Sequence, residues 1–171
     1  IFHLPKFEKK YKAHSLVLKC RSEWFKNKIK SGLGDPSSCV LDEVQYTSTI
    51  EKFLHFLYTG QMKDQVSEDT LDENLDLITF AHLYDMKDLL DLAAQSILNK
   101  LSAENCLLVW KALRVFESES EAGSQQAQTS IDKVLARAIE IIKTEKDQVM
   151  SSDAFVQLEK EDLVAIMRKS N

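Results

Sequence analysis

Histidine and cysteine are the residues of this chain whose side chains could act as a general base, a nucleophile or a metal ligand. Cys20, Cys39 and Cys106 are far apart, and no two of them have the two-residue spacing of a zinc site. No nucleophile and acid flank His14 at a triad-like spacing. We therefore predict no catalytic residue, no metal and no cofactor. His14 is expected at a turn between a strand and a helix, and Cys20 and Cys39 are expected to be small core residues.

The charged residues do not predict a nucleic-acid-binding or phosphate-binding site. The net charge is −5, and the 27 acidic residues are spread over predicted helix faces. The basic groups at Lys9-Lys10 and at 26–30 are too small for a phosphate-binding patch. Gly32-Leu33-Gly34 lacks the further glycine of a phosphate loop. The chain also has no apolar run of roughly 18 residues, so we predict neither a nucleic-acid partner nor a membrane span.

The first hundred residues combine short strands with amphipathic helices. Apolar positions around Pro5 predict two short strands in a hairpin, and residues 14–21 predict a short helix. Ser22 is expected to cap a second helix that ends at Lys30, and 39–41 reads as a short buried strand. Because such strands cannot form a large sheet, we predict an α+β fold in which a small sheet covers one end of a helical cluster.

Two pairs of residues have the spacing of a capping box, in which two side chains satisfy the free backbone groups at a helix start. These pairs are Ser48 with Glu51 and Thr70 with Glu73. Gly60 is expected to end the helix that begins near Ser48. The sequence therefore predicts two successive helices separated by a loop.

The last seventy residues predict an all-helical region. Ser102 is expected to cap a helix, and residues 117–130 then lose all hydrophobic periodicity, which is typical of a mobile polar linker. Apolar residues at helical spacing resume at 131–142. Two shorter helices are expected at 153–158 and 160–169.

Five segments of the chain, at 13–25, 56–60, 81–89, 101–106 and 155–163, carry short motifs in a fixed order. Together they resemble the motifs of one family, the BTB/POZ domain with a BACK-like (three-box type) helical extension, as in cullin ubiquitin-ligase adaptors. The family patterns are A-H-[KR]-x-x-L-x-x-x-S-x-x-F, F-x-Y-[TS]-G, A-x-x-Y-x-[LM]-x-x-L, L-[ST]-x-E-N-[VC] and F-x-x-L-x-x-[ED]-x-L. The resemblance implies a BTB/POZ domain over 1–101 and a BACK-like extension over 102–171, with the polar linker at about 117–130.

The resemblance implies a protein that acts by binding other proteins, not an enzyme. Proteins of this kind commonly form homodimers, and many dock on a cullin scaffold and bring substrates to a ubiquitin ligase. Here the substrates would bind through regions outside this chain, and the expected location is the cytoplasm, the nucleus or both. The alternative is a BTB scaffold or oligomerisation domain of a transcriptional or cytoskeletal protein without cullin binding. The helical extension favours the adaptor, because transcriptional BTB domains usually stop near Leu101.

The resemblance also implies candidate contact residues. In such adaptors, the loop after the second helix carries an apolar residue followed two positions later by Glu, and this chain has Leu33 and Asp35 there. Asp is one methylene shorter than Glu. The turn at Tyr84, Met86 and Lys87 is the other expected cullin contact. The first helix would form the dimer interface, with Leu16, Val17, Cys20 and Arg21 as its candidate residues.

Overall fold

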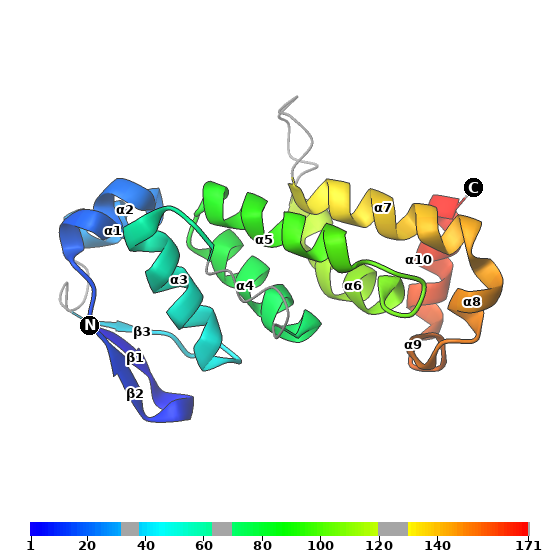
Figure 1. The fold of residues 1–171 in the computed structure, drawn as a ribbon, viewed down its shortest axis with the longest axis horizontal. Helices are drawn as coiled ribbons and strands as arrows, with labels where there is room; N and C mark the ends of the chain where they lie inside the picture. The colour runs from blue at the N-terminus through cyan, green and yellow to red at the C-terminus, as the bar shows by residue number, and fades with distance from the viewer. Residues whose placement is uncertain (32–37, 63–69, 120–129, 171) are drawn as a thin grey trace. The chain divides into compact units, whose positions relative to one another are not determined.

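The computed structural model describes residues 1–31, 38–62, 70–119 and 130–170 (Figure 1). The chain divides into two compact units, residues 1–93 and 94–171. Helix α5 (Lys87–Lys100) begins in the first unit and ends in the second. The predicted polar linker falls mainly on residues 120–129, which lie outside the described residues.

The first unit starts with a three-stranded sheet in the order β2-β1-β3. Strand β1 (Phe2–Leu4) is joined to β2 (Lys9–Tyr11) by a single 3₁₀ turn, η1 (Pro5–Phe7), and the two strands run antiparallel. Strand β3 (Cys39–Val40) lies parallel to β1 on its other side. The predicted hairpin and short third strand are confirmed, although Val40 is exposed and only its neighbours Cys39 and Leu41 are buried.

Within the described residues of the first unit, four complete helices and the start of α5 accompany this sheet, which confirms the predicted α+β class. The ring of Phe2 in β1 lies 5.5 Å from that of Phe25 and 5.7 Å from that of Phe53, at their centroids. All three rings are almost fully buried, so they join the sheet to the second and third helices in one apolar core. The four helices are α1 (Ser15–Arg21), α2 (Glu23–Ser31), α3 (Thr47–Thr59) and α4 (Leu71–Leu83).

The start of α3 differs from its prediction. The Ser48–Glu51 capping box is wrong, because α3 begins at Thr47, which places Ser48 inside the helix, and the Ser48 hydroxyl donates to Glu73 at 2.7 Å. The carboxylate of Asp76 in α4 instead accepts the backbone N–H groups of Gln45 and Tyr46, at 3.1 and 3.2 Å, just before the helix. The backbone N–H groups at the start of α3 are therefore satisfied by a carboxylate thirty residues away, and not by the local side chain that was expected to cap the helix.

The other helix ends of the first unit follow local rules. Thr70 and Glu73 form the predicted capping box at the start of α4. Gly60 ends α3 in the left-handed conformation, with φ of 72°. The Arg21 guanidinium would lie 3.2 Å from a Cβ at Gly60, so both space and backbone conformation favour glycine there.

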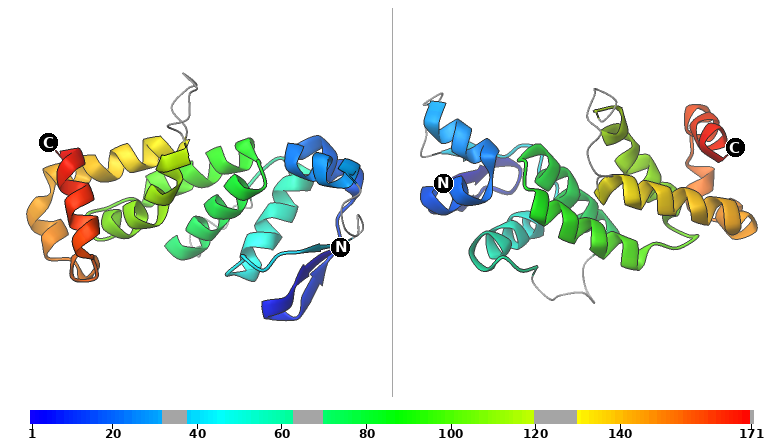
Figure 2. Two further views of the ribbon diagram at one scale, coloured as in Figure 1. Left: turned by 180° about the vertical axis from the view of Figure 1, so that it is seen from behind. Right: turned by 90° about the horizontal axis from the view of Figure 1, so that it is seen from above.

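The described residues of the second unit form helices and no strands (Figure 2). Helix α6 packs along α7, while α9 contacts α6 and α10 contacts α7. The core between α6 and α7 contains Val109, Trp110, Val134 and Ala138, all almost fully buried. The helices are α6 (Cys106–Leu113), the 3₁₀ helix η2 (Arg114–Glu119), α7 (Ser130–Thr144), α8 (Lys146–Met150), α9 (Asp153–Val156) and α10 (Lys160–Ser170).

The predicted cap at Ser102 is wrong. Helix α6 begins at Cys106, and the Asn105 side chain accepts the Ser102 N–H at 2.9 Å and donates to the Lys100 carbonyl at 2.8 Å. The turn between α5 and α6 is thus stabilised by the side chain of Asn105, which forms hydrogen bonds with backbone groups three and five residues earlier in the chain. The sequence also missed the short helix α8, whose residues are exposed apart from Val149.

Candidate protein-interaction surfaces

The exposed face of α1 holds Leu16 and Cys20, two of the four residues expected at a dimer interface. Leu16 is 72% exposed, Cys20 is exposed and Val17 is half-buried, while Leu18 points into the core. Leu16 and Cys20 are four residues apart, so they lie on the same side of the helix. The expectation that Cys20 is a core residue is therefore wrong, whereas Cys39 is buried as expected.

Arg21 lies on a different side of α1, towards α3. Its guanidinium carbon is 5.8 Å from the centre of the Phe56 ring, and its side chain passes next to Gly60. This position lets the cation lie on an aromatic face near the C-terminal end of α3. Arg21 therefore has an intramolecular contact that the helix pattern alone does not predict.

The turn between α4 and α5 has a buried aromatic side chain at its centre. Tyr84 is 6% exposed, and its ring stacks on Phe25 at 5.1 Å and meets the Trp24 ring edge-on at 4.7 Å. Met86 is also buried, whereas Lys87 is exposed. Of the three residues predicted to contact cullin at this turn, Lys87 is the one whose side chain reaches the surface.

Hydrogen bonds fix this turn to two other parts of the unit. The Ser22 hydroxyl donates to the Tyr84 carbonyl at 2.6 Å and accepts the Phe25 N–H at 3.2 Å, so the predicted N-cap of α2 is confirmed. The Tyr84 hydroxyl donates to the Glu43 carboxylate. Burial raises the pKa of Tyr84, and the hydrogen bond and charge of Glu43 raise it further, so the hydroxyl remains a donor at neutral pH.

Replacing Tyr84 by phenylalanine is expected to destabilise the first unit by about 1–2 kcal/mol. The change keeps the ring stack but removes the hydrogen bond to Glu43, whose half-buried carboxylate then loses a partner. Chemical denaturation followed by circular dichroism measures the change. Tyr46→Phe is the matched control, because Tyr46 is exposed. Equal stability of the two variants would show that the Glu43 hydrogen bond contributes nothing.

Leu33 and Asp35, the remaining cullin-contact candidates, lie outside the described residues, in the segment 32–37. Their predicted role therefore stays a prediction from the sequence.

His14 lies between β2 and α1, as predicted, and contacts a tyrosine. Its backbone N–H donates to the Tyr58 hydroxyl at 3.0 Å, and its Nδ1 lies 2.8 Å from the same oxygen. Within the described ranges, no group of three His, Cys, Asp or Glu side chains could hold a metal ion. Over the same residues, no helix has the length and apolar character needed to cross a membrane.

One feature of the first unit could have been found by counting charges along the sequence. Residues 1–31 contain eight lysines and one arginine but only two acidic residues, whereas 32–93 contain thirteen acidic and three basic residues. The small net charge of the whole chain hides this separation. The basic segment forms β1, β2, α1 and α2, which are neighbours in the sheet and in the helix pair.

Comparison with known proteins identifies the first unit. A family model described as BTB/POZ domain matches residues 4–101, which is more than half of the chain. No curated protein matches the chain significantly.

Proposed function

Because the chain belongs to the BTB/POZ domain family, we propose that it is a homodimeric adaptor that docks on the cullin scaffold of a ubiquitin ligase. BTB/POZ domains are protein-interaction domains that are generally non-enzymatic and generally dimerise. The adaptor would act by proximity, holding the scaffold while substrates bind through regions outside this chain. A dimer would add avidity, because the second contact of each pair becomes intramolecular.

The observation that carries the adaptor proposal is the helical unit that follows the family domain. Helices α6 to α10 form a core of their own beyond residue 101, where the match to the family model ends. This arrangement supports the adaptor because the resemblance associates a helical extension with cullin adaptors. The exposed apolar face of α1 supports the dimer, since Leu16 has no core to pack into within its own unit.

Isothermal calorimetry of this chain with the N-terminal region of a cullin, combined with light scattering, tests the proposal. We expect sub-micromolar affinity, one cullin per chain and a mass that matches two copies of each protein. A dimer without cullin binding would instead make the chain a scaffold or oligomerisation domain. A monomer that does not bind cullin would contradict both parts of the proposal.

Lys87→Glu is expected to weaken cullin binding about tenfold, because a charge at the rim of an interface mainly alters association and salt dependence. Lys87 is the exposed one of the three candidate residues at the α4–α5 turn, and the exchange leaves the buried Tyr84 and Met86 in place. The same calorimetry measures the effect. Lys133→Glu on α7 is the control, since it makes the same charge change at an exposed site of the second unit. Equal affinities of the two variants would remove Lys87 from the interface.

A further inference from the structure

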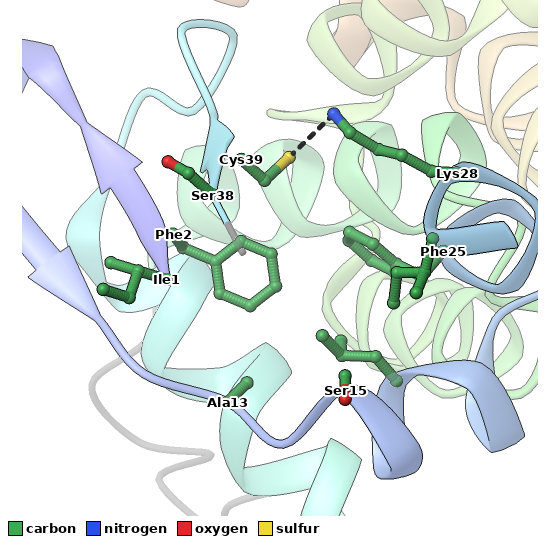
Figure 3. A pocket seen from close by; sticks show the side chains of 10 residues that line it. Ile1, Phe2, Ala13, Ser15, Phe25, Lys28, Ser38 and Cys39 are labelled. Atoms are coloured by element: carbon green, nitrogen blue, oxygen red, sulfur yellow. Dashed lines mark hydrogen bonds between the residues drawn. The ribbon is translucent and has the colours of Figure 1, made fainter. Parts of the chain in front are cut away.

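An open pocket of about 400 Å³ lies between β1, β3, α1 and α2 in the first unit (Figure 3). The rings of Phe2 and Phe25 face it from β1 and α2. The aliphatic side chains of Leu18 and Ile29 also line it. A pocket of this size with apolar walls accommodates a large apolar side chain, which gains free energy by leaving water.

The polar groups of this pocket are neutral or basic. The Lys28 ammonium lies 3.4 Å from the Cys39 sulfur and 4.9 Å from the centre of the Trp24 ring. A second hollow, of about 360 Å³, shares Ile1 and Ala13 with the pocket and is lined by Lys12 and His14 as well. Among the described residues, no acidic side chain lines either hollow.

The surroundings of the pocket add positive charge. Residues 1–31, which supply most of its lining, carry nine basic and two acidic side chains. Lys9, Lys10, Lys12 and Lys30 are all exposed, so their charges act on an approaching partner. A local field of one sign speeds the association of oppositely charged partners and disfavours those of like charge.

We propose that this pocket binds an acidic peptide segment of a partner protein, with a large apolar side chain inside the pocket and carboxylates beside Lys28 and Lys12. The apolar walls supply the anchor site, and the two lysines supply the charge complementarity. A second copy docked through the same face would place like charges together, which disfavours it. The phosphates of a nucleic acid could contact the lysines, but no apolar group of a nucleic acid backbone would fill the apolar pocket.

The proposed site goes beyond cullin docking and does not depend on it. Ser15 and Leu18 line the pocket from α1, whereas Leu16 and Cys20 are exposed on a different side of that helix. The α1 face proposed for the dimer can therefore be occupied while the pocket remains open.

Selection of a phage-displayed random dodecapeptide library on the immobilised chain provides the first test. We expect the enriched sequences to combine several Asp or Glu residues with a Leu, Ile, Phe or Trp. The leading peptide, labelled with fluorescein, is then titrated by anisotropy against the wild type and three variants. Lys28→Glu and Ile29→Glu should each weaken binding at least about tenfold, whereas Lys143→Glu on α7 should leave it within about twofold.

The dependence of peptide binding on salt concentration gives a further readout. The affinity of the peptide should fall as ionic strength rises, because screening weakens its contacts with the lysines. Circular dichroism of each variant shows whether the fold is kept, and Lys12→Glu, at an exposed position, tests the charge independently of the Lys28 contacts.

Several results would overturn the proposal. The first is that no peptide is enriched, and the second is that the enriched peptides carry no negative charge. The third is equal peptide affinity of the wild type, Lys28→Glu and Lys12→Glu. Displacement of the peptide by a single-stranded oligonucleotide at lower concentration than by unlabelled peptide would assign the site to nucleic acid. A mass change that Lys28→Glu reverses in light scattering would assign it to a second copy of the chain.

Discussion

Replacing Asp162 by asparagine is expected to lower the free energy of unfolding of the second unit by about 3 kcal/mol at neutral pH. Asp162 is 1% exposed, and its Oδ1 lies 2.5 Å from the Arg114 guanidinium. Its Oδ2 lies 3.2 Å from the Lys111 ammonium and accepts the Glu159 N–H at 3.1 Å. The carboxylate thus joins α10 to α6 and to the start of η2, and asparagine would leave both cations without their buried anion.

The pH dependence of this effect follows from the environment of the carboxylate. Burial alone would raise the pKa of Asp162, but the Glu159 N–H, Lys111 and Arg114 outweigh burial and hold that pKa below its ordinary value. The folded state therefore binds the proton less readily than the unfolded chain, whose aspartate pKa is about 3.9. The stabilisation is complete above that pH and is lost as the pH falls through the lower, folded-state pKa. Wild type and variant should accordingly converge in acid.

Urea unfolding followed by tryptophan fluorescence measures the loss. The chain has two tryptophans, so Trp24→Phe leaves Trp110 as the only one, and the Arg114 guanidinium carbon lies 5.1 Å from the centre of its ring. Glu161→Gln is the control, because it makes the same kind of change at an exposed position of the same helix. A difference below about 0.5 kcal/mol between Asp162→Asn and this control would mean that the ion cluster contributes nothing.

Sequence reasoning succeeded where the relevant atoms are close along the chain. The Thr70–Glu73 capping box, the Gly60 helix end and the Ser22 cap each involve residues within four positions, and all three are confirmed. Asp76 caps α3 from about thirty residues away, and Asp162 pairs with two cations about fifty residues earlier in the chain. Such partners are brought together by packing, which single-sequence periodicity does not describe.

The same distinction applies to the candidate surfaces. The helical pattern placed Leu16 and Val17 on α1, and the structure leaves Leu16 exposed. Tyr84 was a candidate contact residue, but its side chain is buried against Trp24 and Phe25 from a different helix. The pocket between β1, β3, α1 and α2 has no sequence signature, because four separate elements supply its walls. The charge excess of residues 1–31 was visible in the sequence and would have indicated a basic surface.

Leu16→Lys is expected to weaken the proposed homodimer at least about a hundredfold. Among the described residues of the first unit, Leu16 is the most exposed large apolar residue, and a two-fold interface through α1 would bury it twice. Burial of a leucine side chain contributes roughly 1.5–3 kcal/mol, so losing two of them costs about 3–6 kcal/mol. Lysine is a stricter test than glutamate, because Lys19 and Arg21 on the same helix of the partner copy could pair with an introduced carboxylate.

Sedimentation equilibrium over a range of concentrations separates this result from unfolding when it is combined with circular dichroism. Leu83→Lys is the matched control, since Leu83 is an exposed leucine near the end of α4. The basic charge around α1 also predicts that the wild-type dimer tightens as ionic strength rises, because salt screens the repulsion between like faces. The peptide site has the opposite salt dependence, so one salt titration distinguishes the two surfaces. An unchanged dimer in Leu16→Lys would place the dimer interface elsewhere than on α1.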